Sequence, residues 1–400
     1  MTPQDTAIEL PAPAPGTPGP PCAYAALRAD QPIARVRTPR GDSAWLVTRH
    51  EDVRAVLADP RLVRPLMSEW PPGRPAAEHA GLGVRTLLEM TGDQHARVRR
   101  IIAPLFSPRR VARYAPRVRA LAERLAGGVE AAGPPADLVA GFTEPLPLMV
   151  LCDVVGFPYE ERDRYLPLTD AVLRATALPL DEVLAALAAL QEYVTELIER
   201  RRTDPGDDLL GELLAGVGTQ TGLTREELVS FAASVLMAGY KTNVQHLGNA
   251  LLTLLADPGR PRRLREAPEL LPSAVEELLR HVPLMNAIVV TVATEDLTLC
   301  GRRIRAGEAV LPVIASANRD GAVFPDADRV DLERTPNPHL AFGHGPHYCP
   351  GGHLTRLQLR VALATLLHRF PGLELAVPAD RLDWDEENPL RAPLALPVRW

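Results

Sequence analysis

Lysine is almost absent from this chain of 400 residues. Its lysines and arginines together number 44, and Lys241 is the only lysine among them. Acidic residues outnumber basic ones, so the net charge is −6 and the isoelectric point is near 6.0. This balance does not favour a nucleic-acid partner, because nucleic acid is bound by an excess of positive charge. A single lysine in so arginine-rich a sequence calls for a local explanation.

Long apolar runs and paired cysteines are also missing. No run approaches the ~18 apolar residues that a membrane span needs, and no basic start followed by an apolar stretch marks a signal peptide. The cysteines are scattered and form no C-x-x-C pair: Cys22, Cys152, Cys300 and Cys349. This pattern argues against a disulfide framework and fits a reducing compartment. We therefore expect a cytoplasmic protein with no membrane segment.

Helical periodicity covers most of the chain, and short alternating segments are few. Residues 1–21 are proline-rich and predict an extended lead-in, while 34–47 and 297–310 alternate like short strands. The sequence predicts a mainly α protein with minor β content. We expect helices over residues 51–58, 94–107, 109–131, 143–155, 159–175, 180–203, 207–216, 224–256, 261–268, 271–281 and 353–369.

The longest expected helix covers residues 224–256. Thr224 and Glu227 form a capping-box pattern at its start, and Asp257-Pro258 ends it, because proline clashes with a continuing helical turn. A helix of this length would span about 50 Å at 1.5 Å per residue. Gly239 lies in its middle, where glycine costs about 1 kcal/mol relative to alanine. This position indicates either a close helix–helix contact or a place where a ligand approaches the backbone.

The densest chemical run of the chain surrounds Cys349. It reads Phe-Gly-His-Gly-Pro-His-Tyr-Cys-Pro-Gly-Gly over residues 342–352. Glycines let a backbone wrap closely around one sulfur, and a thiolate held in this way can bind one iron axially. Zinc is the rival, because His344, His347 and His353 add nitrogen ligands to the same sulfur.

Residues 342–351 match the haem-binding signature FGxGxHxCxG at every fixed position, and the chain therefore resembles the cytochrome P450 family of soluble bacterial type. Glu277 and Arg280 resemble the family's ExxR motif, and residues 324–329 resemble its meander. His95 and Arg99 share one helical face, as in the pair that binds haem propionates. The resemblance implies the cytochrome P450 fold, with a long central helix over the haem and the cysteine loop beneath it. It also implies one haem–thiolate oxygenase domain over residues 22–400.

The resemblance implies haem b (iron protoporphyrin IX) as cofactor, with Cys349 as the iron ligand. The implied structural ion-pair triad is Glu277, Arg280 and Arg329. Thr291 stands where relatives often place a propionate-binding arginine, and Pro350 after the cysteine lacks an N–H that could bond the thiolate. The implied haem contacts besides Cys349 are His95, Arg99, His339, Phe342, Gly345, His347 and Gly351.

On the oxygen side, the family pattern is an acid followed by a threonine that together deliver protons. Thr242 matches the threonine, but Lys241 occupies the acid position. We hypothesise that Lys241 replaces the acid as proton donor, or fixes an anionic or carbonyl group of the substrate. A third option is that proton delivery matters less because a substrate radical couples. The residues expected to line the substrate pocket are Met237, Ala238, Tyr240, Met285, Ile288 and Val289, with parts of 66–90.

The resemblance implies a monooxygenase that oxidises a small organic substrate with O₂, in secondary-metabolite biosynthesis. Oxidative C–C or C–O coupling, for example of an aromatic or cyclic-peptide natural product, is the alternative, and a non-catalytic haem sensor is a remote one. No reductase domain is attached, so electrons would come from an acidic ferredoxin and its reductase to a monomeric enzyme. Eight arginines between Arg97 and Arg119, with no acid among them, are a candidate docking stripe for the ferredoxin.

Overall fold

The computed structural model describes residues 7–17, 19–38, 41–65, 86–174, 178–219, 222–282, 284, 289–386 and 390–400. The chain divides into two compact units. Unit 1 consists of Met1–Ala96 with Glu276–Cys349, and unit 2 consists of Arg97–Val275 with Pro350–Trp400. The single domain that the sequence predicts over residues 22–400 stays a prediction.

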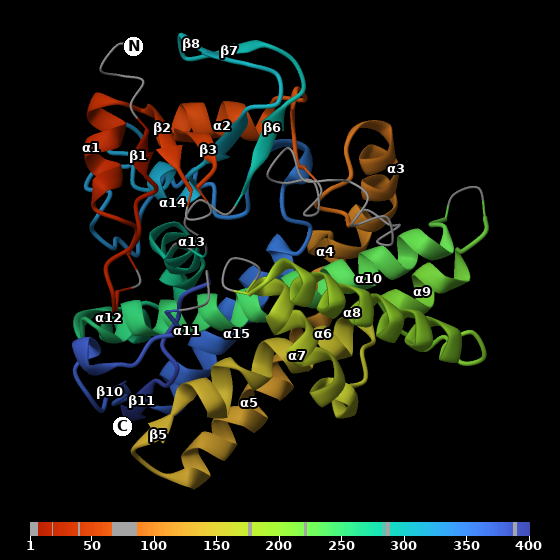
Figure 1. The fold of residues 1–400 in the computed structure, drawn as a ribbon. Helices are drawn as coiled ribbons and strands as arrows, with labels where there is room; N and C mark the ends of the chain where they lie inside the picture. The colour runs from red at the N-terminus through yellow and green to blue at the C-terminus, as the bar shows by residue number, and fades with distance from the viewer. Residues whose placement is uncertain are drawn as a thin grey trace. The chain divides into compact units, whose positions relative to one another are not determined.

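Unit 1 is built on a mixed sheet of six strands in the order β1-β2-β3-β9-β6-β4, with a separate β7-β8 hairpin (Figure 1). The pairs β1–β2 and β3–β9 are parallel, and the other neighbours in the large sheet are antiparallel. Its strands are β1 (Ile8–Glu9), β2 (Ile33–Arg37), β3 (Ser43–Val47), β4 (Leu62–Val63), β6 (Thr291–Ala293), β7 (Leu297–Leu299), β8 (Arg302–Ile304) and β9 (Ala309–Pro312).

The sheet of unit 1 has an apolar layer on each face, because successive side chains of a strand point to opposite sides. Trp45 and Val47 of β3 belong to one buried cluster, which includes side chains of α2. Ala44 and Leu46 belong to the other cluster, with Tyr24 of α1. The helices are α1 (Ala23–Asp30), α2 (His50–Ala58) and α14 (Ile314–Ala317), while α3 (Gly92–Ile102) and α13 (Leu271–His281) run across the division between the units.

Unit 2 is helical, with one small three-stranded sheet ordered β10-β11-β5. In it α5 packs on α15, and α7, α8 and α10 pack on one another (Figure 1). Its elements are α4 (Pro108–Val111), α5 (Ala115–Ala132), β5 (Ala136–Asp137), a π-helical turn η5 (Val139–Thr143), α6 (Pro145–Val155), α7 (Arg162–Leu173), α8 (Leu180–Arg200), α9 (Leu209–Ala215), α10 (Arg225–Gly239), α11 (Lys241–Leu255), α12 (Gly259–Glu266), α15 (Gly352–Arg369), β10 (Glu374–Leu375) and β11 (Pro397–Arg399).

The mainly α prediction with minor β content is confirmed, and most expected helices differ from the observed ones by a few residues at their ends. The short 3₁₀ turns η3 (Ala103–Phe106) and η4 (Ala112–Tyr114) interrupt the expected 94–107 and 109–131 helices. Within the described ranges, none of the helices is both long and apolar enough to cross a membrane.

A buried ion-pair network holds the end of α13 to the segment after residue 317. Arg280 donates from Nε and Nη2 to the two oxygens of Glu277, both at 2.7 Å, and neither side chain is exposed. Arg280 also donates to the carbonyls of Asn318 and Ala327 at 2.7 and 2.8 Å. Such a pair is held by many hydrogen bonds, and removing one partner would leave a buried charge uncompensated.

The third member of this network is Arg334, and the assignment of that place to Arg329 was wrong. Arg334 Nε lies 3.1 Å from Glu277 Oε2, and its side chain is 7% exposed. Arg329 is exposed and contributes only its carbonyl, which accepts from Arg280 Nη2 at 3.2 Å. Arg329 ends the meander pattern and Arg334 follows it by five residues, and the spacing along the sequence does not distinguish which of the two turns inward.

The two arginines make a matched pair for a stability measurement. We expect Arg334→Met to lower the free energy of unfolding by about 3 kcal/mol, because it leaves the buried Glu277 carboxylate short of charge compensation. Arg329→Met should change it by less than about 0.5 kcal/mol, since an exposed side chain is removed. Urea unfolding of the two variants and the wild type checks this. Equal losses of unfolding free energy in the two variants would contradict the assignment of Arg334 to the network.

Candidate active site

The Cys349 loop is closed by backbone hydrogen bonds within unit 1. The amide of Cys349 donates to the carbonyl of Phe342 at 2.9 Å, and the amide of Tyr348 donates to Gly345 O at 3.1 Å. Gly343 and Gly345 have φ values of +75° and +71°, which favour glycine. The loop therefore folds back on itself and leaves the Cys349 side chain half-buried.

Gly345 is required for a second reason, which is its contact with the C-terminal end of α2. A Cβ at Gly345 would lie 2.6 Å from Leu57 O and 2.9 Å from Ala58 Cα. These neighbours are backbone atoms, which cannot move aside as a flexible side chain would. The motif glycine thus lets the cysteine loop lie directly against α2.

Two of the histidines near Cys349, His344 and His347, each contact another side chain. His344 Nε2 accepts a hydrogen bond from Arg54 Nε at 3.3 Å, and burial together with the Arg54 charge lowers the pKa of His344. His347 lies against His95, with ring centroids 4.2 Å apart. Among the described residues, no group of three or more His, Cys, Asp or Glu side chains could hold a metal ion. The four-ligand zinc cage considered for the sequence is therefore not formed by them.

This arrangement fits a haem better than a bare metal ion. Cys349 offers one soft ligand in a glycine-built loop, and a porphyrin supplies its own nitrogen ligands to the iron. Two residues predicted to contact the haem, His95 and His347, lie together within unit 1. Arg99 follows His95 by one turn of α3 and is half-buried.

The other predicted haem contacts lie in the same loop or at its edges. His339 Nε2 is 3.0 Å from Glu276 Oε2, and its Nδ1 accepts from the Ala341 amide at 3.2 Å. Phe342 is half-buried, and its ring centroid lies 6.3 Å from that of Tyr348. Gly351 immediately precedes α15. Thr291, at the position of the missing arginine, donates its hydroxyl to Val310 O at 3.0 Å within the sheet.

The long helix over residues 224–256 is not continuous, which corrects the prediction. The capping box is present, with Glu227 N–H donating to Thr224 Oγ1 at 3.1 Å. The helix then breaks at Tyr240, whose backbone has φ −97° and ψ −76°, so that α10 ends at Gly239 and α11 begins at Lys241. Ala256 and Asp257-Pro258 follow the end of α11 as expected.

Side chains take over hydrogen bonds at the break. Asn243 Nδ2 donates to Gly239 O at 2.7 Å, whereas the Asn243 backbone amide donates to Tyr240 O at 3.0 Å. The Thr242 hydroxyl donates to Ala238 O. Polar side chains that replace backbone donors are a known cause of helix kinks. The sequence Lys-Thr-Asn therefore shapes the backbone as well as supplying polar groups.

Lys241 has a carboxylate partner. Its Nζ lies 3.7 Å from Asp170 Oδ1 of α7, and the two side chains are 22% and 37% exposed. Asp170 also lies 3.5 Å from Arg174, which in turn lies 3.4 Å from Asp385. Charges thus alternate from the first residue of α11 to the C-terminal segment of unit 2. A half-exposed pair of this kind contributes at most about 1 kcal/mol, so it opens easily.

The expected pocket residues have varied environments. Ala238 is exposed, while Gly239 faces α6, where an added Cβ would be 3.0 Å from Leu151 Cδ1. Tyr240 is buried and donates its hydroxyl to Glu144 Oε1 at 3.0 Å, and burial followed by the Glu144 charge raises the pKa of Tyr240. Met237 is also buried.

The remaining expected pocket residues belong to unit 1 or fall outside the described ranges. Val289 is half-buried and packs against an apolar cluster of unit 1. Met285 and Ile288 lie outside the described residues, as does 66–85.

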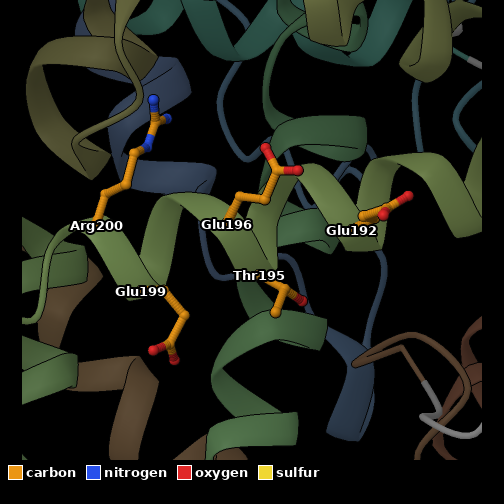
Figure 2. A pocket seen from close by; sticks show the side chains of 5 residues that line it. All are labelled: Glu192, Thr195, Glu196, Glu199 and Arg200. Atoms are coloured by element: carbon orange, nitrogen blue, oxygen red, sulfur yellow. The ribbon is translucent and has the colours of Figure 1, made fainter.

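A shallow hollow on α8 contains none of the expected site residues (Figure 2). Figure 2 shows Glu196 and Arg200 pointing to one side of α8 and Thr195 and Glu199 to the other. Glu196 lies 3.0 Å from Arg164, and Glu199 lies 2.5 Å from Arg225. These carboxylates are engaged in surface ion pairs, so the hollow is a charged helix face.

Some arginines of the stripe form ion pairs with acidic residues from other parts of the folded chain. Arg97 pairs with Glu227, Arg110 with Glu212, and Arg117 with Asp153. The other stripe arginines that are exposed and have no ion-pair partner among the described residues are Arg100, Arg109, Arg113 and Arg119.

Sequence reasoning missed Asp170, Glu144 and Arg334. Asp170 and Glu144 are ordinary acidic residues of predicted helices, and no local pattern indicates which helix they will face. Arg334 carried a weak signal, because it follows the meander closely. All three become visible only when distant segments pack together.

Comparison with known proteins shows the family to which this chain belongs. The family model for cytochrome P450 matches residues 171–383. The chain is 44% identical to mycinamicin IV hydroxylase/epoxidase of Micromonospora griseorubida and 45% identical to nocardicin C N-oxygenase of Nocardia uniformis subsp. tsuyamanensis, covering 94% of both chains in each case. The solved structure of the mixed-function P450 MycG matches with a TM-score of 0.86 and 40% identity, covering 99% of this chain and 100% of that one.

The fold and these relatives thus define a haem–thiolate protein. The chain belongs to the cytochrome P450 family and is a monooxygenase of that family, with haem as its cofactor. When bound, the haem supplies the oxygen-activating chemistry, and the family draws its electrons from redox partners. The remote alternative of a haem sensor does not agree with relatives named for their oxidation reactions.

The contact between Gly345 and α2 makes a specific prediction. We expect Gly345→Ala to lower haem content several-fold, because its Cβ would overlap Leu57 O and force the cysteine loop away from α2. The ratio of haem absorbance to protein in purified samples measures this. The control is Gly321→Ala, whose Cβ would meet nothing within 4 Å. Full haem loading of Gly345→Ala would contradict the account.

Proposed function

We propose that this enzyme inserts one oxygen atom into a small organic substrate in secondary-metabolite biosynthesis. The overall reaction consumes the substrate, O₂, two electrons and two protons, and releases the hydroxylated or epoxidised product and water. The observation that carries the proposal is the Cys349 loop, where a single thiol is framed by glycines and seated against α2. Both relatives above are named for oxygenation reactions, one on mycinamicin IV and one on nocardicin C.

The proposed haem ligand is Cys349, with Phe342 beside the sulfur and Gly345 and Gly351 giving the loop its backbone path. His95, Arg99 and His347 are proposed to bond the haem propionates, since charged donors bind carboxylates strongly. His339 is proposed as a further donor. It now contacts Glu276, so propionate binding would require it to exchange that partner.

The names of the relatives do not identify the substrate of this enzyme. Two proteins of nearly equal identity to this chain are named for different reactions, one a hydroxylation and epoxidation, the other an N-oxygenation. We propose that Met237, Ala238, Tyr240 and Val289 line the pocket, together with Met285 and Ile288. Ala238 is the most accessible of those described, and it lies directly before the break between α10 and α11.

Labelling with ¹⁸O₂ distinguishes oxygen insertion from oxidative coupling. A ligand panel scored for haem spin-state shift first identifies a substrate, and turnover under ¹⁸O₂ with a surrogate ferredoxin system follows. We expect one ¹⁸O atom per product molecule, because insertion takes one atom from O₂. An unlabelled product joined by a new C–C or C–O bond would contradict oxygen insertion and support the coupling alternative.

Lys241 and Thr242 are the proposed proton-delivery residues. Thr242 keeps lone pairs on Oγ1 while it donates to Ala238 O, so it can accept a hydrogen bond from a water or another donor. Lys241 is an ammonium held by a weak ion pair, and it can therefore be released at little cost. A substrate carboxylate or carbonyl would have to compete with Asp170, so proton donation is the role that the contacts favour.

We expect Lys241→Met to lower the yield of product per electron consumed by on the order of tenfold and to raise the yield of hydrogen peroxide. The reason is that a general acid accelerates proton transfer by at least this factor. Asp170→Asn should give a smaller loss by releasing Lys241. Asp163→Asn is the control, because Asp163 lies on the same helix and its side chain is 87% exposed. Product and peroxide per NADH are measured.

The conservative variant Lys241→Arg separates the two roles of the pair. It keeps the attraction to Asp170, but a guanidinium does not give up a proton, so coupling efficiency should stay low. Recovery of wild-type efficiency would show that only the ion pair matters. If neither single variant changes turnover, product ratio or peroxide, Lys241 is a bystander.

We propose that an acidic ferredoxin and its reductase supply the electrons to a monomeric, cytoplasmic enzyme, with no nucleic-acid or membrane partner. The supporting feature is a group of exposed arginines for which no ion pair is seen with any other described residue: Arg100, Arg109, Arg113 and Arg119. In unit 2, α4 packs against α15, which carries the exposed Arg360. A basic surface of this kind attracts an acidic partner through long-range charge.

We expect the double variant Arg109→Glu/Arg113→Glu to slow ferredoxin-dependent reduction by about tenfold or more at low salt and to flatten its salt dependence. The control is the double variant Arg303→Glu/Arg305→Glu, which changes the net charge by the same amount at exposed sites of unit 1. Stopped-flow reduction across a salt series gives the rates. Equal slowing by this control would mean that net charge, and no particular surface, is responsible.

A further inference from the structure

Arg64 directly follows strand β4 of unit 1 and lacks a counter-charge among the described residues. It is half-buried, and the burial of its guanidinium lowers the pKa of Arg64 to about 10. No ion pair or side-chain hydrogen bond joins it to another residue of the described ranges. A charge taken out of water without a partner is unfavourable, so we expect a bound group to neutralise it.

The acidic residues that flank the neighbouring strands are engaged elsewhere. Asp59, before β4, and Glu295, after β6, lie 2.7 and 3.9 Å from Arg61. Glu308, immediately before β9, forms an ion pair with Arg35. Within the described ranges, these carboxylates are therefore not available to neutralise a further arginine.

The pairing of β4 with β6 shows where Arg64 lies in the sheet. In this antiparallel pair Val63 is opposite Val292. One residue further on, the same register brings Arg64 opposite Thr291, and directly opposite residues of paired strands project from the same face. The Thr291 hydroxyl donates to Val310 O at 3.0 Å, so its single side-chain donor is already used within the sheet.

The face from which Arg64 projects adjoins the cysteine loop. Residues two apart in a strand share a face, so Arg64 lies on the side of Leu62. Leu62 belongs to the buried cluster that also contains Leu57 and Leu340. The carbonyl of Leu57 meets the cysteine loop at Gly345, and Leu340 comes just before that loop in the sequence. The apolar layer beside Arg64 thus extends to the backbone that shapes the loop.

We propose that Arg64 binds a carboxylate of the bound haem and so supplies the guanidinium that position 291 lacks. Haem b carries two propionates, and the planar guanidinium of arginine binds a carboxylate through two parallel hydrogen bonds. An anionic substrate is the other source of the same carboxylate chemistry. The haem is favoured because Arg64 is the cross-strand neighbour of Thr291, on the face that adjoins the cysteine loop. The proposal rests on haem as the cofactor and does not depend on which oxidation the enzyme performs.

The rate of haem loss tests the proposal without reference to turnover. We expect Arg64→Met to speed the transfer of ferric haem from the purified holoenzyme to apomyoglobin by about tenfold or more, because a charge-assisted hydrogen bond is lost. Thr291→Arg, added to this variant, should slow haem loss again, since it returns a guanidinium to the opposite strand. The control is Arg61→Met, which removes an arginine already paired with Asp59. Unchanged haem loss in Arg64→Met, or an equal acceleration in Arg61→Met, would overturn the proposal.

The dimethyl ester of haem distinguishes propionate binding from packing, because its propionates carry no charge. In protein reconstituted with the ester, Arg64→Met should change the rate of loss by less than about twofold, since the interaction it removes is absent. Equal acceleration with haem b and with the ester would mean that Arg64 only supports the fold, and would overturn the proposal. Arg64→Lys keeps the charge without the planar fork, and it takes the place of Arg64→Met if that variant does not fold. Its acceleration should be smaller and again confined to haem b.

Substrate binding separates the two sources of the carboxylate. The ligands of the spin-state panel that carry a carboxylate are titrated into the wild type and Arg64→Met. We expect faster loss of haem b in the variant. If the variant instead retains haem b as the wild type does and binds these ligands more weakly, the partner of Arg64 is the substrate, and the assignment to the haem is overturned. A wild type without substrate-dependent turnover would contradict the proposed function and leave the measurements of haem loss valid.

Discussion

The close approach of Gly345 to the backbone of α2 is the constraint on which the site depends. With no side chain at residue 345, the loop lies against Leu57 O and Ala58 Cα, and the hydrogen bond from Cys349 to Phe342 then fixes the loop around one sulfur. A second anchor comes before the cysteine loop in the sequence. There the Glu277–Arg280–Arg334 network holds the end of α13 to the segment that precedes the loop. A rigid, shielded thiol is what a single axial ligand requires.

The sequence predicted the features that local spacing determines. The FGxGxHxCxG run, the capping box at Thr224 and the pairing of Glu277 with Arg280 all depend on residues a few positions apart. The choice of Arg334 over Arg329 depends on how the meander folds back onto α13, and no local spacing contains that information. The break at Tyr240 was missed for a similar reason. Its side chain is anchored by Glu144, almost one hundred residues earlier, and the helical periodicity continues across it.

Lys241 acquires a different meaning from its surroundings. The sequence shows only that a cation stands where relatives have an acid, whereas the structure gives it Asp170 as a partner and places both in a series of alternating charges. The carboxylate is thus supplied by α7 instead of α11. The pair thus links the first residue of α11 to α7 within unit 2.

The central claim is that Cys349 is the thiolate ligand of the haem. The carbon-monoxide difference spectrum of the reduced holoprotein tests it most directly, with Cys349→Ser prepared in parallel. The account predicts the red-shifted band of thiolate-ligated haem in the wild type and its loss in Cys349→Ser. A wild-type spectrum typical of nitrogen-ligated haem, or a thiolate band that persists in Cys349→Ser, would contradict it.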